Sequence, residues 1–579
     1  MGKEGKRLIL AAALSFVVLI TFQMFSSRNN KQTVPVAMSS IKAEVTPEAK
    51  IAAASAQKTE VKIVIPAKAL GALKGEELLF ETPYAFIKFD TLGGRIKSWV
   101  LKEYQENGKN VNVIWNNELN TYPGTLEIPS LKFYDHAFYT AKKTENSMEL
   151  TATVKNVIEV KKVYTFRKDN FACDITLNIR SLNKEVKKIA DAKLFLGAGI
   201  NNHFVYTEEG EQIPEEKISA IKDYVVPFAH LHYLDEKLIK NTFTYDKKTN
   251  MDGSLEMFIK TGPKETDKGA LSWIGMKDKY YLSAFLLKPE AGFKGYEHAL
   301  LYTPWVRLTP ANTAKGVKPF QVPYIMPLVA LELPEFDAEK GTAQEVTLYA
   351  GPLVYEKLKA IKIGLYKAME MGWSWFSWLA IWMLIILKWI FAICKNWGLA
   401  IIILTVLVKI VTWWPTQKSY IAMKKMQEVQ PEINALKERF KDNPQKQTEE
   451  TMKLYKEKKV NPLGGCLPML LQIPIFVALY AVLANAIELK NASFLIWKDL
   501  SLKDPYFILI AIMIITMIIQ QKMTPSADAQ QAKMMMWMMP IMFAIFFWSL
   551  PAGVILYWVV QNILGIAQQM MVNKGTPTA

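Results

Sequence analysis

The sequence predicts two kinds of structure in one chain, a polytopic α-helical membrane part and an all-β domain outside the membrane. Apolar residues make up 51% of the 579 residues while 21% are charged, so the apolar character must be concentrated in segments. Long apolar segments follow residue 372, and one more lies near the N-terminus. Between residues 59 and 350 the pattern is one of short alternating runs with turn signals, which is typical of a β-sandwich. A chain of this length is expected to hold several domains.

The net charge of +16 comes from basic residues that are scattered along the chain, which favours an anionic lipid surface over nucleic acid. The three cysteines are far apart and match no zinc or CxxC spacing, so a disulfide scaffold is excluded. The sequence contains no GxxxxGK[ST] loop, and no GxGxxG turn between a strand and a helix. We therefore expect no nucleotide, metal or other cofactor and no enzymatic activity.

Residues 1–28 are predicted to form an uncleaved membrane anchor with a cytoplasmic N-terminus. The apolar run 8–25 follows Lys3, Lys6 and Arg7 and is long enough to span a bilayer. A cleaved signal peptide is the alternative, but residues 26–28 make a poor cleavage site. Residues 29–58 lack aromatic residues and periodicity and are predicted to be a flexible linker. The outer β-sandwich is predicted over residues 59–352.

The positive-inside rule decides which of the later apolar segments cross the membrane. Residues 415–462 hold eleven Lys or Arg residues, so this loop is predicted to be cytoplasmic. It would lie outside if both 373–393 and 397–414 crossed, and we therefore place 373–393 flat on the outer face. The predicted spans are 8–25, 397–414, 463–484, 505–521, 534–550 and 554–572, with both termini inside.

A tryptophan stripe supports the interfacial placement of segment 373–393. Trp375, Trp378, Trp382 and Trp389 fall within roughly 60° of arc on a helix. A one-sided tryptophan stripe suits the membrane interface. The alternative is a true span that returns through a short turn at 394–397. Residues 353–396 are thus predicted to hold a connecting helix and this amphipathic helix, ahead of a membrane core at 397–572 and a short cytoplasmic tail at 573–579.

The cytoplasmic loop 415–462 is predicted to be a helical hairpin. Its apolar residues repeat at three- and four-residue spacing in the first arm, at Met423, Met426, Val429, Ile433, Leu436 and Phe440. Residues 442–444 interrupt the run, and Pro431 should kink the first arm. A merely solvated charged loop is the alternative.

Lys409 is the only charged residue within the six predicted spans. A lysine at a helix centre costs about 2.5–3.5 kcal/mol, while each Leu or Ile returns only about 0.3–0.6 kcal/mol. No carboxylate lies in the spans to pair with it, so we expect Lys409 to expose its charge in a water-filled cavity within the bundle. The alternative is snorkelling, in which the side chain reaches the cytoplasmic headgroups.

Further polar residues in the spans are candidates for lining this cavity. They are Thr405, Thr412, Gln472, Thr516, Gln561 and Asn562, with Gln520 at the end of a span. Each of them alone is also explained by an interhelical hydrogen bond. Together they are compatible with a hydrophilic groove.

Several motifs make the chain similar to the YidC family of membrane protein insertases. They are Asn396-Trp397-Gly398, Gln430-Pro431, Val460-Asn461-Pro462-Leu463-Gly464-Gly465-Cys466, Gln472-Ile473-Pro474-Ile475-Phe476 and Pro551-Ala552-Gly553. The N-terminal anchor and the large outer domain, with Asp90-Thr91-Leu92-Gly93-Gly94 and Trp273-Ile274-Gly275, resemble its Gram-negative type.

The resemblance implies a multi-pass protein of the bacterial inner membrane, with a five-span insertase core and a periplasmic β-sandwich similar to sugar mutarotases. It implies a groove open to the cytoplasm and to lipid, with Ile473, Phe476, Tyr557 and Trp558 where the family contacts a client. The family usually has arginine where Lys409 stands, and its proline comes one residue earlier than Pro415. Lysine keeps the charge but lacks the planar fork of arginine. The implied partners are nascent membrane proteins, the Sec translocon and the lipid bilayer.

A weak ribosome contact is expected through the hairpin, because the tail 573–579 holds one basic residue. Two other functions are weighed. A small-solute transporter is disfavoured because no inverted repeat is seen and one cation makes no coupling-ion site. A carbohydrate-active outer domain would use histidines such as His230 and His232, but no matched pair of acids accompanies them.

Overall fold

The structure is a computed structural model in which two compact units divide near Gly351 and Pro352. It describes residues 74–106, 108–114, 121–183, 186–198, 229–234, 237–242, 245–249, 255–259, 271–288, 295–308, 320–372, 376–441, 443–460, 467–523 and 529–575. The predicted anchor 8–25 and linker 29–58 lie outside the described residues.

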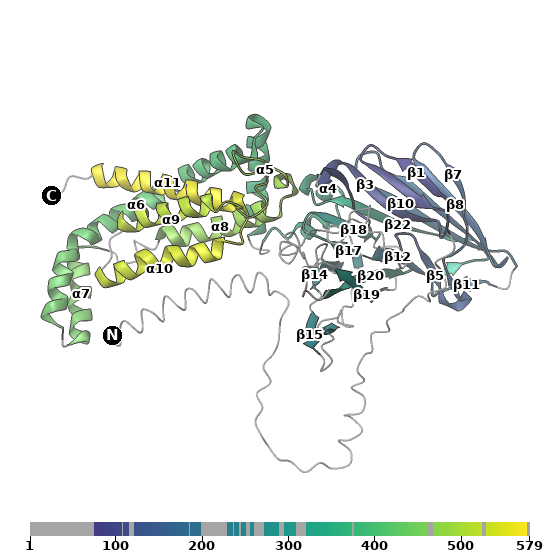
Figure 1. The fold of residues 1–579 in the computed structure, drawn as a ribbon, viewed down its shortest axis with the longest axis horizontal. Helices are drawn as coiled ribbons and strands as arrows, with labels where there is room; N and C mark the ends of the chain where they lie inside the picture. The colour runs from purple at the N-terminus through teal and green to yellow at the C-terminus, as the bar shows by residue number, and fades with distance from the viewer. Residues whose placement is uncertain are drawn as a thin grey trace, which may run out of the picture. The chain divides into compact units, whose positions relative to one another are not determined.

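The first unit is built from antiparallel β-strands (Figure 1). The strands are β1 Glu77–Glu81, β2 Ala85–Asp90, β3 Arg95–Glu106, β4 Lys109–Asn112, β5 Leu126–Ile128, β6 Phe133–Tyr134, β7 Thr140–Lys143, β8 Ser147–Val154, β9 Ile158–Phe166, β10 Ala172–Ser181, β11 Lys188–Ile189, β12 Lys193–Ala198, β13 Ala229–Leu234, β14 Lys237–Thr242, β15 Tyr245–Thr249, β16 Leu255–Ile259, β17 Leu271–Lys277, β18 Tyr281–Leu286, β19 Gly295–Leu308, β20 Phe320–Glu332, β21 Phe336–Asp337 and β22 Ala343–Pro352.

Three larger sheets organise these strands. The largest has nine strands in the order β14-β13-β17-β18-β22-β10-β9-β8-β7, the next has five in the order β19-β20-β12-β5-β6, and β1 to β4 form a third. Buried and more exposed residues alternate along β8 and β9, as the sequence pattern predicts. The prediction of an all-β domain is confirmed.

The core of the β unit contains a buried charge, Lys162, on the inward face of β9. Its ammonium donates hydrogen bonds to the carbonyl oxygens of Gly93 and Gly124, both at 2.7 Å, and forms an ion pair with Asp135. Both charged side chains are 0% exposed. Gly93 has a φ of 82°, which a residue with a side chain rarely adopts, so the motif at residues 90–94 shapes the loop that meets Lys162.

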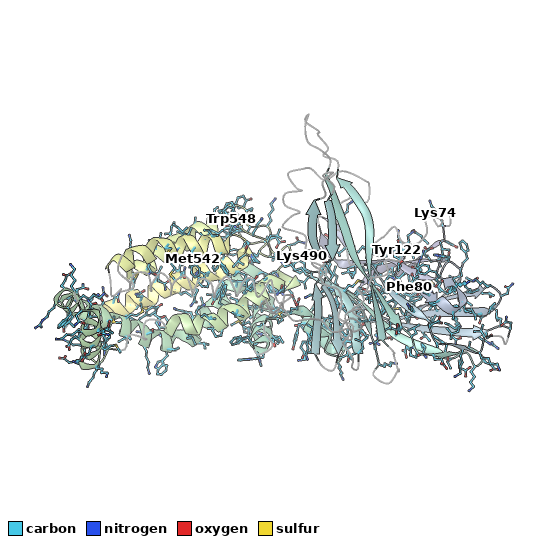
Figure 2. All side chains as sticks on the ribbon, turned by 90° about the horizontal axis from the view of Figure 1, so that it is seen from below. Lys74, Phe80, Tyr122, Lys490, Met542 and Trp548 are labelled. Atoms are coloured by element: carbon cyan, nitrogen blue, oxygen red, sulfur yellow. The ribbon has the colours of Figure 1, made fainter. Side chains whose placement is uncertain are left out.

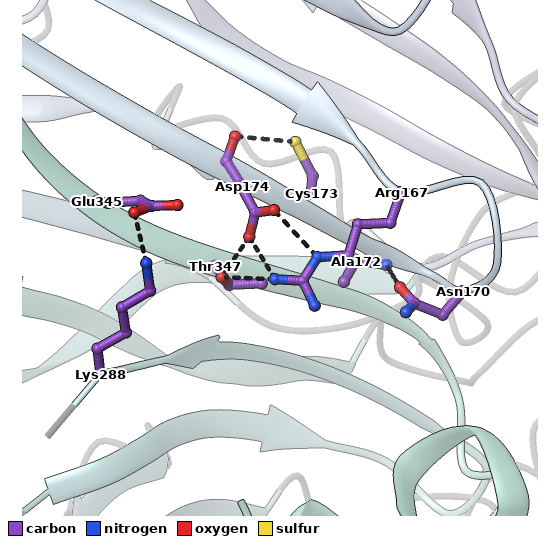
Figure 3. A network of polar contacts seen from close by, with 8 residues as sticks. All are labelled: Arg167, Asn170, Ala172, Cys173, Asp174, Lys288, Glu345 and Thr347. Atoms are coloured by element: carbon purple, nitrogen blue, oxygen red, sulfur yellow. Dashed lines mark hydrogen bonds and ion pairs between the residues drawn. The ribbon is translucent and has the colours of Figure 1, made fainter. Parts of the chain in front are cut away.

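A second polar network joins β10 and β22 of the nine-stranded sheet to Arg167, the residue that follows β9 (Figure 3). The Arg167 guanidinium donates to both carboxylate oxygens of Asp174, at 3.0 and 2.7 Å. Thr347 on β22 donates to the same carboxylate at 2.5 Å. Unlike Lys162, Arg167 and Asp174 are partly exposed.

The second unit is helical. Its helices are α4 Tyr355–Ala360, the 3-10 turn η4 Leu365–Met369, α5 Ser377–Cys394, α6 Trp397–Arg439, α7 Pro444–Glu457, α8 Leu467–Asn485, the 3-10 turn η6 Ile487–Leu489, α9 Ile508–Met523, α10 Ala529–Phe547 and α11 Ala552–Gly575. The connecting segment is not one continuous helix, because Lys362 and Gly364 adopt positive φ values and separate α4 from η4.

Length and composition alone allow three of the helices in the described part of the chain to cross a membrane: α5, α6 and α11. The apolar portions of α8, α9 and α10 are shorter. Their positions match the predicted segments 463–484, 505–521 and 534–550. The number of spans stays a prediction.

Helix α6 is 43 residues long and joins the predicted span 397–414 to the first arm of the hairpin without a break. The Asn396 side chain caps its start by accepting a hydrogen bond from the Leu399 backbone at 3.0 Å. Figure 1 shows that α6 bends before it reaches α7. The hairpin stripe packs as predicted, with Val429 and Ile433 buried against Leu454 and Val460. Asn443 caps α7 and Pro444 begins it, which explains the break at 442–444.

Helix α5 runs across the end of the helical bundle (Figure 1). Its buried residues are Ala380, Met383, Leu384, Leu387 and Ile390. Trp378, Trp382 and Trp389 lie on the opposite, exposed side, as the stripe predicts. Trp375 lies outside the described residues. Large apolar side chains are exposed elsewhere in the helical unit too, among them Trp548, just after α10 (Figure 2).

Candidate functional site

Helix α11 packs against α6, α8 and α9, so polar residues on its faces meet residues of all three helices. Its polar residues and Gly565 recur at three- and four-residue spacing, at Gln561, Asn562, Gly565, Gln568 and Gln569. This spacing places them along one broad face of the helix. The candidate site lies where this face meets Lys409 of α6.

Lys409 is buried inside this bundle and only 4% exposed. Its ammonium lies 5.9 Å from the centre of the Tyr420 ring. The two residues are eleven positions apart, which is about 16 Å along an α-helix. The lysine side chain must therefore extend along α6 toward the hairpin, where Tyr420 reaches back to meet it.

Gly565 faces this ammonium from α11. A β-carbon at Gly565 would lie 3.9 Å from the Lys409 Nζ, 3.4 Å from the Tyr420 hydroxyl and 3.3 Å from the Gln520 amide nitrogen. The Tyr420 hydroxyl also pairs with the Gln520 side chain. Three groups able to donate hydrogen bonds thus meet around a residue without a side chain, and we call this set the ammonium cluster.

The burial of Lys409 differs from the expectation of an exposed charge in a water-filled cavity. The reason is that Tyr420, Gln520 and α11 cover the ammonium from the hairpin side. The position combines features of the two alternatives, a cavity within the bundle and snorkelling. The side chain extends toward the hairpin, as in snorkelling, but it remains buried within the bundle. In the described part of the chain no carboxylate pairs with Lys409, so its charge is buried without an opposite charge beside it.

The structure brings the other predicted polar residues together in two groups. Gln472 of α8 donates to the Tyr557 hydroxyl, and Gln561 donates to Gln472 at 3.2 Å. Asn562 donates to Thr516 of α9 at 3.2 Å. These are the interhelical hydrogen bonds that the sequence offered as the alternative to a groove lining.

Thr405 and Thr412 do not join those groups. Their hydroxyls donate to backbone carbonyls one turn earlier in α6, at Ile401 (2.7 Å) and Val408 (2.9 Å). Such bonds satisfy a hydroxyl within its own helix. Both threonines are buried.

The sequence reasoning missed a further polar group near the hairpin. Gln568 of α11 accepts a hydrogen bond from Thr416 at 3.1 Å and donates to the Trp413 carbonyl at 3.0 Å. Gln569 donates to the Met523 carbonyl at 2.7 Å. The spacing of polar residues along α11 could have identified Gln568 and Gln569, and it continues the face that holds Gln561 and Gly565.

The four residues expected to contact a client differ in their surroundings. Ile473 is 50% exposed on α8. Phe476 and Trp558 lie edge to face at 5.1 Å, and Phe547 of α10 packs against both. Tyr557 is 1% exposed, and its hydroxyl accepts a hydrogen bond from Gln472, so its role in client contact stays a prediction.

Two family models match consecutive parts of the chain. A model described as YidC periplasmic domain matches residues 77–386, and one described as 60Kd inner membrane protein matches residues 389–579. Together they cover both units of the structure.

Individual proteins and structures are also similar. The membrane protein insertase YidC of Syntrophus aciditrophicus is 33% identical over 98% of this chain and 99% of that protein. A crystal structure of an active YidC insertase is 18% identical, covers 87% of this chain and 94% of its own, and has a TM-score of 0.36.

A galactose mutarotase related enzyme from Lactobacillus acidophilus is 9% identical, covers 48% of this chain and 97% of its own, and has a TM-score of 0.26. The full-length identity to the Syntrophus protein and the two consecutive family matches agree with the motifs of the sequence. The chain belongs to the YidC family of membrane protein insertases.

Proposed function

We propose that this chain inserts newly made proteins into the bacterial inner membrane by receiving a client's polar or acidic flank at the ammonium cluster. The apolar part of the client then moves along the outer faces of α8 and α11 into lipid. The observation that carries this proposal is a buried lysine without a carboxylate partner in the described helical unit.

The electrostatics favour an anion at this place. An ammonium held away from water loses hydration, and the groups that meet Lys409 in the ammonium cluster, a phenol, an amide and a glycine, carry no opposite charge. A client carboxylate would supply the missing opposite charge. Charge-assisted hydrogen bonds contribute about 1.5–3 kcal/mol each, so the cluster would lower the cost of bringing an acidic flank under the lipid surface.

Release of the apolar part needs no nucleotide. A segment of about 20 apolar residues favours lipid by several kcal/mol. The exposed Ile473 on α8 and the aromatic group around Phe476 and Trp558 offer a surface along which such a segment can leave. The chain therefore acts by partitioning, and we assign it no chemical reaction.

The proposed topology places both termini and the α6–α7 hairpin in the cytoplasm and the β unit in the periplasm. Support comes from the eleven basic residues of 415–462. In this orientation the hairpin receives clients, with the ribosome held weakly by Lys424, Lys425, Lys437, Arg439 and Lys441. The chain would work alone or beside the Sec translocon.

Replacement of Lys409 tests the proposal. Lys409→Arg should support insertion, while Lys409→Glu should fail for clients with acidic flanks and keep much of its activity on clients with neutral flanks. Insertion is measured in cells depleted of their own insertase, with protease protection of two clients that differ only in the flank.

The matched control is Lys418→Glu, which makes the same charge change on the same helix at an exposed position, where the ammonium lies over the Trp414 ring. This variant should insert both clients normally. Equal activity of the wild type and both Lys409 variants on the acidic client would overturn the proposal.

A further inference from the structure

Helix α5 is apolar on two sides, so apolarity does not decide whether it crosses the membrane. One side is buried against α6 and α8, and the other presents tryptophans. The helix is also long enough to span. Some polar feature must therefore set its position, and the structure offers one in the C-terminal half of the helix.

Lys388 lies in the C-terminal half of α5 and is held by carboxylates from two other elements. Its ammonium is 2.6 Å from an oxygen of Glu356 on α4 and 3.1 Å from an oxygen of Glu488 on η6. The Lys388 and Glu488 side chains are 27% and 13% exposed. The second oxygen of Glu488 is buried without a hydrogen-bond partner, so this carboxylate depends on Lys388.

The partners of Lys388 fix the level at which it lies. Glu488 lies three residues after the end of α8 at Asn485, so the part of α5 that holds Lys388 lies beside the end of α8 and not beside its middle. Just beyond the end of α5, the Asn396 amide reaches the Ser493 carbonyl at 3.5 Å, in the loop after the same end of α8.

A helix that crossed beside α8 would move about 12 Å along the membrane normal between residues 388 and 396. Here both positions stay beside the segment 488–493. Figure 1 shows the same arrangement, with α5 running across the end of the bundle.

We propose that Lys388, paired with Glu356 and Glu488, is the positioning residue that holds α5 on the outer membrane surface and thereby sets the orientation of every helix after it. The inference rests on the proposed topology, in which the end of α8 is outside. If α5 entered the bilayer, the three charges would lose water and the orientation of α6 to α11 would be reversed, with the hairpin outside.

The test measures on which side of the membrane the hairpin lies. A full-length chain whose native cysteines are replaced carries Gln445→Cys, at an exposed position of α7, and intact cells are treated with a maleimide that does not cross the membrane. A parallel chain with Lys142→Cys, exposed in the β unit, gives the maximum labelling. We expect no labelling of position 445 in the wild type or in Lys388→Arg.

Lys388→Met should shift the balance between the flat and the crossing helix by on the order of 100-fold, because an intramembrane ammonium is replaced by an apolar side chain. Position 445 should then be labelled in a measurable fraction of chains. The triple variant Lys388→Met, Glu356→Gln, Glu488→Gln should give the same result while leaving no buried carboxylate unpaired, which keeps the test valid if the single variant is degraded.

The matched control is Lys359→Leu on α4, which also removes one outer positive charge but no ion pair to α5. It should leave position 445 protected. Protection of position 445 in both the single and the triple variants would overturn the role of Lys388. Labelling of position 445 in the wild type would instead overturn the proposed topology.

Discussion

Lys162 in the β unit and Lys409 in the helical unit are both buried lysines, but their surroundings are opposite. Lys162 is met by one carboxylate and two backbone carbonyls. Lys409 is met by a phenol ring, an amide and a glycine, with no carboxylate paired to it in the described part of the chain. One charge is satisfied within the protein, and the other leaves room for a partner from outside.

The comparison separates two uses of a buried charge. A buried ion pair with its hydrogen bonds complete fixes local structure, and removing one member leaves the other charge buried alone. A buried charge without an opposite charge is costly to keep, and such residues in membrane helices commonly mark a pathway. Replacing a lysine of the first kind should lower the stability of the protein, and replacing one of the second kind should lower its activity.

The largest expected effect is on the stability of the β unit. Lys162→Met should destabilise it by about 3–5 kcal/mol, because Asp135 would remain as an unpaired buried carboxylate. Thermal unfolding followed by protease sensitivity of the β unit measures the loss. Lys161→Met is the matched control, since the neighbouring Lys161 pairs with Glu149 at a half-exposed site and should change stability by less than about 1 kcal/mol. Equal effects of both changes would contradict this account of Lys162.

Lys409→Met should show the reverse behaviour. Its stability should match or exceed that of the wild type, because the change leaves no carboxylate unpaired. Insertion of a client with an acidic flank should fall by roughly tenfold or more, the loss of one charge-assisted hydrogen bond. Thermal unfolding and an insertion assay on the same preparation check both parts. If Lys409→Met destabilised the helical unit as much as Lys162→Met destabilises the β unit, the two buried lysines would not differ in the way described here.

The smallest expected effect concerns the partly exposed pair in the β unit. Burial alone would raise the pKa of Asp174, but hydrogen bonds from Arg167 and Thr347 outweigh it and hold this pKa below its ordinary value. A lowered folded-state pKa means that the pair stabilises the domain above the unfolded value and that this stability is lost as the pH falls through the folded value.

Asp174→Asn should therefore cost about 1 kcal/mol at neutral pH, and the difference from the wild type should shrink below about pH 4. Urea denaturation at several pH values measures this. Glu345→Gln, which breaks the more exposed pair with Lys288, serves as the comparison and should have a smaller effect at neutral pH. A difference for Asp174→Asn that grows as the pH falls would contradict the assigned sign.

Local signals in the sequence predicted the elements well. Asn443 followed by Pro444 marks a helix start, and the stripe through Val429 and Ile433 predicts the face that is buried. The alternation of β9 also places Lys162 on the inward face, between Val160 and Tyr164. A lysine at such a position signals a buried partner.

These local signals could not predict which residues surround Lys409. The residue itself stands out because it is the only charge in the predicted spans, but Tyr420, Gln520 and Gly565 come from three helices. Which residues meet depends on how α6, α9 and α11 pack, and the spacing within one helix does not contain that. For the same reason they could not predict that Tyr557 is buried and accepts a hydrogen bond from Gln472.

The continuity of α6 sets a distance that the client itself must bridge. A helix of 43 residues is about 65 Å long, while the hydrocarbon core of a bilayer is about 30 Å thick. In the proposed orientation, about 35 Å of α6 extends beyond the hydrocarbon core and carries the hairpin. The part of α6 from Tyr420 to its end at Arg439 is about 28 Å long, so a polypeptide handed over at the hairpin tip would need about nine fully extended residues to reach the ammonium cluster. A shorter polar flank could not contact the hairpin tip and the ammonium cluster at the same time. The length of α6 therefore sets a minimum flank length for clients that are handed over at the tip.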